Sequence, residues 1–239
     1  MTQALYAEDA YLRSAPAELA AVTETGHLVL RASLFCPAGG GQPGDKGALH
    51  LADRTVTIID CVKGEAGSIE LVPAPDQVLP APGAGGSQTL DWPRRHQLMR
   101  MHTALHLLSV VLPFPVTGGA IGAEKSRLDF NMPEAPEDKA QIEAALNALI
   151  AADHPVSERW ISEAELDANP GLVKTISVAP PRGVGRIRLV QIGAAEAPVD
   201  LQPCGGTHVR RTGEIGPVVL GKIEKKGRQN RRVSITLAP

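Results

Sequence analysis

Two pairs of side chains in this sequence could bind a metal ion. His102 and His106 are four residues apart, and Cys204 and His208 have the same spacing around Gly205-Gly206-Thr207. On a helix, residues four apart lie on one face about one turn from each other, so both imidazoles can reach one ion. Two glycines permit a tight turn, in which a thiolate and an imidazole can converge. Each pair alone is weak evidence, because two histidines can simply lie on a helix face and a glycine turn can simply bury a cysteine.

Taken together, the two pairs supply three imidazoles and one thiolate. This donor set suits Zn²⁺, which takes three or four such ligands in a tetrahedron. The sequence therefore predicts a zinc site formed by His102, His106, Cys204 and His208. It leaves open whether His208 or a water molecule is the fourth ligand. A metalloprotease is disfavoured, because Thr103 stands where such enzymes have a glutamate after the first histidine.

The elements that must position these ligands are predicted by apolar periodicity. Residues 94–112 lack glycine and proline, and apolar residues recur there at three- and four-residue steps, which predicts a helix with one buried stripe. A second helix is predicted over residues 134–152, with acidic residues in its first turn. Strands are predicted over 172–178, 186–192, 217–223 and 231–237. We therefore expect helices packed on an antiparallel sheet in the second half.

The first half has a different pattern. Within residues 1–75, short apolar segments at 27–30, 48–51 and 56–59 are separated by Gly, Pro and Asp, which predicts a small barrel or sandwich. Residues 73–87 are rich in Pro and Gly and form either a linker or a long exposed loop. We place a domain boundary there, so that residues 1–88 and 89–239 are separate domains of an α+β protein.

Composition limits the class of protein. The 239 residues carry a net charge of −2, so any nucleic-acid binding must depend on a local patch. No apolar run approaches the roughly 20 residues needed to span a bilayer, and the acidic N-terminus is unlike a secretory signal. Three cysteines do not suggest a disulfide framework, and we interpret Cys36 and Cys61 as core residues. These features favour a cytoplasmic protein.

One local patch is strongly basic. Residues 221–232 contain six cations and a single acid, Glu224. This pattern could be a solvated hairpin tip that protects an edge strand. In a chain of slightly negative charge we favour contact with phosphates. Arg94 and Arg95, just before the histidine pair, could extend the patch. The predicted RNA-contacting residues are Arg94, Arg95, Lys222, Lys225, Lys226, Arg228, Arg231 and Arg232.

The motifs resemble those of a known family. His-Thr-Ala-Leu-His-Leu-Leu, followed about a hundred residues later by Cys-Gly-Gly-Thr-His-Val, resembles the editing domain of alanyl-tRNA synthetases and the related domain of threonyl-tRNA synthetases. Four further segments are similar to the alanine type in order and content, although Cys36 stands where that family has an aromatic residue. The matching segments are residues 102–108, 204–209, 35–47, 91–95, 212–216 and 227–232.

The resemblance implies a function. The chain is too short to include a synthetase catalytic core, so it is similar to the freestanding, medium-length editing proteins, which have an N-terminal β-barrel before an α/β zinc domain. The family hydrolyses the ester that joins a wrong amino acid, serine or sometimes glycine, to alanine tRNA. The implied partner is mischarged alanine tRNA, and neither DNA nor a membrane is expected. The oligomeric state is not indicated.

Four residues outside the zinc set are candidates for the reaction. Backbone N–H groups at Gly40 and Gly41 could stabilise the oxyanion, because glycine permits close approach. Gln42 could contact the aminoacyl group or the adenosine, and Thr207 could donate a hydroxyl. The alternatives are a plain hairpin loop and a residue that only shapes its turn. The rival function is a non-catalytic RNA-binding module with a structural zinc.

Overall fold

The computed structural model describes residues 1–176, 183 and 185–238. It divides into two compact units, Met1–His96 and Gln97–Pro239. Both units contain strands and helices, and the first contains a closed barrel. The expected mixed α/β fold with a barrel in the first half is therefore confirmed. Among the described residues, none of the helices has the length and hydrophobicity to cross a bilayer.

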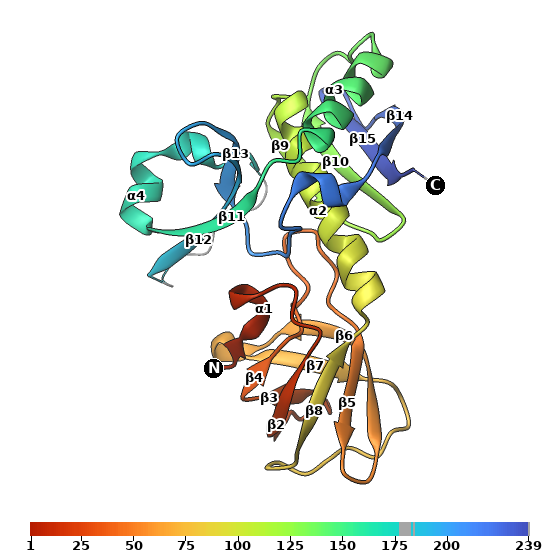
Figure 1. Ribbon diagram of the computed structural model, residues 1–239, viewed down its shortest axis with the longest axis vertical. Coiled ribbons are helices and arrows are strands. Elements are labelled where there is room, and N and C mark those ends of the chain that lie inside the picture. Colours follow the sequence, from red (N-terminus) through yellow and green to blue (C-terminus); the bar gives the residue numbers. More distant parts are fainter. Residues whose placement is uncertain (177–182, 184, 239) are drawn as a thin grey trace. The chain divides into compact units, whose positions relative to one another are not determined.

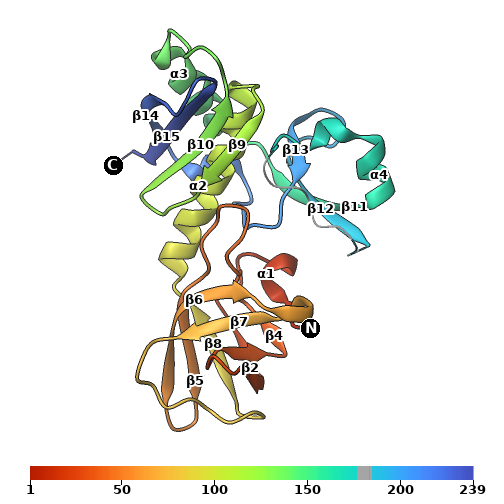
Figure 2. The same ribbon diagram turned by 180° about the vertical axis from the view of Figure 1, so that it is seen from behind.

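The first unit is a closed six-stranded barrel (Figures 1 and 2). Its strands alternate between buried and exposed residues, as one-sided burial requires. Leu28, Leu49, Ile58 and Leu71 are among the inward side chains of its aliphatic core. In barrel order the strands are β2 (Ser14–Val22), β3 (Leu28–Leu30), β7 (Ile69–Pro73), β6 (Thr55–Lys63), β5 (Gly47–Leu51) and β8 (Gly85–Leu90). Short elements accompany them: β1 (Gln3–Ala4), α1 (Leu5–Glu8), β4 (Ala32–Ser33) and a 3-10 turn at Glu65–Gly67.

The segment rich in Pro and Gly lies within this barrel. It connects β7 to β8, and β8 pairs with both β2 and β5 to close the sheet. Of the two alternatives for this segment, the structure therefore has the loop. The assignment of residues 1–88 and 89–239 as functional domains stays a prediction.

Among its described residues, the second unit contains two separate antiparallel sheets, two whole helices and most of a third. The four-stranded sheet has the order β14 (Val218–Lys225), β15 (Asn230–Leu237), β10 (Lys125–Asn131) and β9 (Val116–Ala120). The three-stranded sheet has the order β11 (Val156–Ser162), β12 (Arg186–Gly193) and β13 (Pro198–Pro203). The helices are α2 (Trp92–Val111), α3 (Lys139–Ala151) and α4 (Glu163–Ala168), and 3-10 turns cover Pro170–Leu172 and Thr212–Ile215. One continuous sheet was expected, and two are found.

The predicted helix over 94–112 is confirmed as α2, but its environment differs from the prediction. Met99, Thr103, Ala104 and Leu107 are buried together with the predicted apolar stripe, which is Leu98, Met101, Leu105, Leu108 and Leu112. The middle of α2 is thus enclosed on all sides, and the single buried stripe was wrong. These additional buried residues are small or apolar, so they fit a fully buried helix as well as a half-buried one.

Two other predicted elements differ from the structure. The second helix begins at Lys139 rather than at residue 134, because Asp138 caps it by accepting a hydrogen bond from the backbone N–H of Gln141 (2.9 Å). Pro136 also disfavours helix at the residue before it. Over the described part of 172–178, residues 172–176, no strand forms, and Thr175 makes only an isolated bridge to Val116; residues 177 and 178 lie outside the described residues.

α3 packs against the edge of the four-stranded sheet through polar and apolar contacts. Its buried side chains are Ile142, Leu146 and Ile150. The Asn147 amide donates to the carbonyl oxygen of Val218 and accepts from its N–H, both at 2.9 Å. This reciprocal pair satisfies a strand edge that would otherwise face the helix without a partner.

Candidate metal centre and its surroundings

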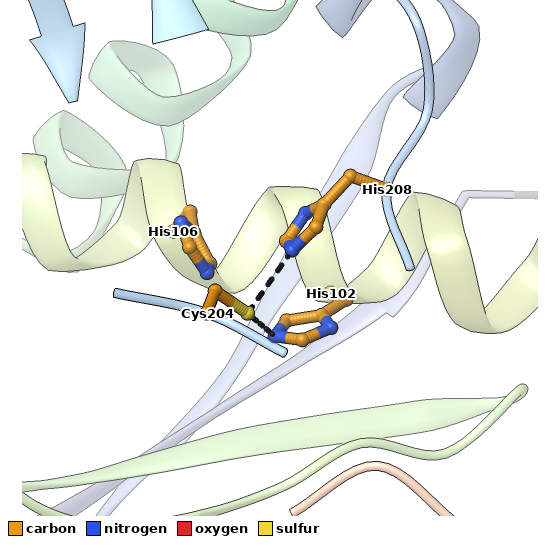
Figure 3. A group of neighbouring side chains, drawn as sticks. All are labelled: His102, His106, Cys204 and His208. Atoms are coloured by element: carbon orange, nitrogen blue, oxygen red, sulfur yellow. Dashed lines mark hydrogen bonds between the residues drawn. The ribbon is translucent and has the colours of Figure 1, made fainter. Parts of the chain in front are cut away.

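The four predicted ligands converge in the second unit. One candidate ligand atom from each of His102, His106, Cys204 and His208 lies within 4.8 Å of all the others. Figure 3 shows the four side chains pointing toward one another from α2 and from the segment after β13. All three histidines are buried, with 6–7% of their surface exposed. Sequence spacing thus identified a real cluster, although the pairs are about a hundred residues apart.

The donor geometry fits a tetrahedral ion. The Sγ atom of Cys204 is 3.4 Å from Nε2 of His102 and 3.3 Å from Nε2 of His208. Zinc–sulfur and zinc–nitrogen bonds of about 2.3 and 2.0–2.1 Å place two ligands of a tetrahedron about 3.5 Å apart. The observed spacing is therefore close to that of a shared zinc ion.

Partners behind two histidines fix which ring nitrogen faces the cluster. Nδ1 of His106 is 2.9 Å from Oδ2 of Asp200, and a carboxylate can only accept, so this nitrogen carries the proton. The Thr103 hydroxyl donates to the Met99 carbonyl oxygen (2.9 Å) and accepts from Nδ1 of His208 (3.1 Å). In both histidines the partner takes Nδ1, which leaves Nε2 as the nitrogen that faces the cluster and can bind a metal.

Asp200 is itself held by three donors. It is buried, and besides His106 it accepts from Nζ of Lys174 (2.5 Å) and from the Gln202 amide (2.7 Å). Burial opposes its ionisation, but the hydrogen bond and charge of His106 and the charge of Lys174 together lower its pKa to about 2. The carboxylate is thus a fixed anion behind the cluster.

The electrostatics of the cluster favour the ligand form of its thiol. Burial raises the pKa of Cys204, but the charges of His102 and His208 outweigh it, and the pKa is held well below its usual range. Burial and the charge of His102 both lower the pKa of His208. Burial also acts to lower the pKa of His106, yet its hydrogen bonds to Asp200 and Cys204 raise it to about 9.

The turn that carries Cys204 is held by an arginine. The Arg188 guanidinium donates to the carbonyl oxygens of Cys204 and Gly206, both at 2.8 Å, and forms an ion pair with Glu158. Neither of the two described glycines of this turn, Gly205 and Gly206, has a left-handed backbone. The turn thus depends on a buried cation more than on glycine flexibility.

Sequence reasoning missed Asp200, Gln202, Thr103, Lys174 and Arg188. One signal could have found the first two. Residues 200, 202 and 204 alternate along an extended segment, so their side chains share one face. From sequence, Thr103 served only as evidence against a metalloprotease. Its role depends on a contact with His208, more than a hundred residues away.

We expect Asp200→Asn to weaken zinc binding by about 10- to 100-fold, because loss of a partner that orients a ligand has effects of this size. An amide can present its NH₂ to His106 and no longer supplies a fixed negative charge. The zinc dissociation constant would be measured by competition with a chelator. Asp153→Asn is the control, since Asp153 is an exposed partner of Arg211. Equal zinc affinity in both variants would refute this role of Asp200.

The other predicted reaction residues lie in different places. Thr207 is fully buried next to the candidate ligand His208. Gly40 and Gly41 belong to the first unit, where they form a tight turn with φ of 57° and 85°. The N–H groups of Gly39 and Gln42 bond to each other's carbonyl oxygens across this turn (3.0 Å each). The positive φ at both central positions of such a turn favours glycine.

Gln42 and the base of the glycine turn are internal. The Gln42 side chain is 2% exposed and its amide contacts Sγ of Cys36 at 3.8 Å. Asp45 accepts from the backbone N–H of Cys36 (2.6 Å) and forms an ion pair with Arg95. Arg95 also donates to the carbonyl oxygens of Ala10 (3.0 Å) and Leu34 (2.7 Å). The Asp45–Arg95 ion pair and these hydrogen bonds thus hold both ends of the glycine-rich segment, residues 35–47, in the barrel unit.

The structure gives several predicted RNA contacts another role. Arg95 is 1% exposed and is committed to Asp45, so it is not available to phosphates. Arg231 is buried and donates to the Pro133 carbonyl oxygen, and Arg232 forms two hydrogen bonds with Asp129 (2.8 and 2.9 Å). Arg94 is half-buried and donates to the Gly44 carbonyl oxygen (2.9 Å). The exposed members are Lys222, Lys225, Lys226 and Arg228, at the hairpin of β14 and β15.

Comparison with known proteins agrees with this site. Residues 187–234 match the family model described as the threonyl and alanyl tRNA synthetase second additional domain. The alanyl-tRNA editing protein AlaX-M of Methanosarcina acetivorans is 34% identical over 248 residues, with 99% of each chain covered. AlaX-M of Saccharolobus solfataricus is 30% identical over the full length of both. The alanine–tRNA ligase of Pyrobaculum neutrophilum is 36% identical over 94% of this chain but only 25% of the ligase. The chain therefore belongs to the AlaX-M family of alanyl-tRNA editing proteins.

Proposed function

We propose that this protein is a trans-editing hydrolase that removes serine, with glycine as a second candidate substrate, from mischarged alanine tRNA. The observation that carries the proposal is the buried cluster of three imidazoles and one thiolate in a chain that matches AlaX-M proteins over its whole length. We further propose that His102, His106, Cys204 and His208 hold Zn²⁺, and that the protein acts in the cytoplasm. The division into a barrel domain, 1–88, and an editing domain, 89–239, belongs to the same proposal.

The proposed reaction is ester hydrolysis. Water adds to the ester carbonyl, the bond to the terminal ribose oxygen breaks, and that oxygen leaves with a proton. A bound zinc ion would supply a positive charge next to the aminoacyl group. The 3.3 Å contact between Cys204 and Nε2 of His208 supports four protein ligands, in which case the ion orients substrate and holds the pocket together. Gly40 and Gly41 are the proposed oxyanion donors, and Gln42 and Thr207 the proposed substrate contacts.

The proposed test compares alanine tRNA charged with serine, glycine or alanine. We expect the wild-type protein to accelerate release of serine most and of alanine least. A four-ligand site is also what a structural zinc requires, which keeps the non-catalytic RNA-binding module as the second candidate. Tight binding of serine-charged tRNA without faster hydrolysis would favour that module and refute the enzyme.

The exposed hairpin cations are the proposed phosphate contacts. We expect Lys225→Glu together with Arg228→Glu to weaken tRNA binding and to reduce the slope of log affinity against log salt by roughly one per lost contact. Binding would be measured by fluorescence anisotropy over a range of salt concentrations. Lys139→Glu, an exposed cation at the start of α3, is the matched control. An unchanged slope would remove the hairpin from the proposed interface.

A further inference from the structure

Trp160 is an unusual residue of the second unit. The chain has only seven Phe, Trp and Tyr residues, and Phe35 and Phe130 are fully buried. Trp160 is instead 49% exposed, on the edge strand β11. The guanidinium carbon of Arg186 lies over its ring, 5.5 Å from the centroid. Such an exposed aromatic with a cation beside it has the chemistry of a site that stacks nucleobases.

The position of Trp160 relates it to the candidate metal centre. Trp160 is paired directly with Arg188 across β11 and β12, so both side chains project from the same face. Across β12 and β13, the N–H of Cys204 donates to the carbonyl oxygen of Arg188 at 3.1 Å. Trp160, Arg188 and Cys204 therefore lie in one row across the sheet. Two strand spacings, roughly 10 Å, separate the backbone of Trp160 from that of the ligand Cys204.

The opposite face of the sheet explains why Trp160 is not a core residue. Ile161, Ile187 and Leu189 project from that face and pack with Leu166 of α4. Side chains alternate between faces along a strand, so Trp160 cannot join this core. The guanidinium of Arg186, a diagonal neighbour on β12, lies over its ring instead.

We propose that Trp160 and Arg186 form a binding site for a nucleotide in the unpaired 3′ end of the tRNA, with its base stacked on the indole and its phosphate next to the guanidinium. The inference rests on the proposed function, because the aminoacyl ester must lie at the cluster for the preceding nucleotides to reach this row. Unpaired RNA is commonly recognised by stacking on aromatic and arginine side chains. A cation that faces solvent beside the ring also complements phosphate charge.

Fluorescence tests the stacking directly. The chain has two tryptophans, so Trp92→Phe leaves Trp160 as the only indole. A hairpin RNA copying the acceptor stem of alanine tRNA, with its unpaired 3′ nucleotides, should quench this fluorescence. The same stem with a blunt end should not. Equal quenching by both RNAs, or quenching by neither, would overturn the proposal.

Affinity provides the second readout. Trp160→Ala should raise the Kd for the hairpin with the unpaired end by about tenfold, since one stacked base contributes on that order. Trp160→Tyr should retain most of the affinity, because tyrosine also stacks. Phe114→Ala is the control, as Phe114 is another exposed aromatic of the second unit, at 38%. An unchanged Kd in Trp160→Ala, or an equal loss in Phe114→Ala, would contradict a specific site.

The outcomes separate this inference from the proposed function. Hydrolysis of serine-charged tRNA with no response of Trp160 to RNA would leave the function standing and refute the binding site. Quenching without hydrolysis would support the site and refute the enzyme. If sedimentation shows that Trp160→Ala abolishes self-association and leaves RNA affinity intact, the residue contacts a second copy of the chain and the proposal fails.

Discussion

Replacing Cys204 by serine, or His102 by alanine, is expected to reduce hydrolysis of serine-charged alanine tRNA by about 10³-fold or more. Stabilisation by a bound ion is worth several kcal/mol, and each 1.36 kcal/mol is a factor of ten in rate. The zinc content should fall from about one per chain to a small fraction of that. Single-turnover deacylation and metal analysis of the purified variants would measure both effects.

The control for this prediction is another buried cysteine. Cys61 is fully buried in the barrel, where its Sγ contacts the Phe35 carbonyl oxygen at 3.8 Å. Burial raises the pKa of this thiol far above its usual range, so it has none of the thiolate character of a ligand. The Cys61→Ala protein should have the same zinc content per chain as the wild type. Full activity of a zinc-free Cys204→Ser protein would refute the metal-dependent reaction.

Asp45→Asn is expected to destabilise the barrel by about 3–5 kcal/mol, because removing one partner of a buried ion pair leaves the other charge uncompensated. Asp45 and Arg95 are both 1% exposed. Burial acts to lower the pKa of Arg95, and its hydrogen bonds with Asp45 raise it. The variant loses this compensation, but the guanidinium stays charged because arginine is not deprotonated in proteins. Unfolding in urea would be followed through Trp92, in a protein in which Trp160 is phenylalanine.

An exposed ion pair of the same unit is the matched control. Asp53 and Arg54 form an ion pair with 64% and 37% of their side chains exposed. Solvent screens such a pair, so Asp53→Asn should leave the unfolding midpoint almost unchanged. Equal midpoints for Asp45→Asn and wild type would show that the buried pair is not required for stability.

The sequence by itself determined the donor set and most of the helices and strands. The four-residue spacings at 102–106 and 204–208 identified the side chains that converge, because helix periodicity and a short turn are local properties. Apolar segments at 27–30, 48–51 and 56–59 correspond to strands of the barrel for the same reason. Local patterns were less informative at Glu134, where a cap four residues later decided the start of α3.

Only the tertiary structure decided what surrounds those residues. From its sequence context, Arg95 is expected to be an exposed cation. The fold instead buries it beside Asp45, which is fifty residues away. Asp200 and Thr103 become partners of ligand histidines through contacts that span about a hundred residues. Trp160 shares a row with Cys204 only because β11, β12 and β13 pair in one register. Burial and register depend on long-range pairing, which local residue spacing does not encode.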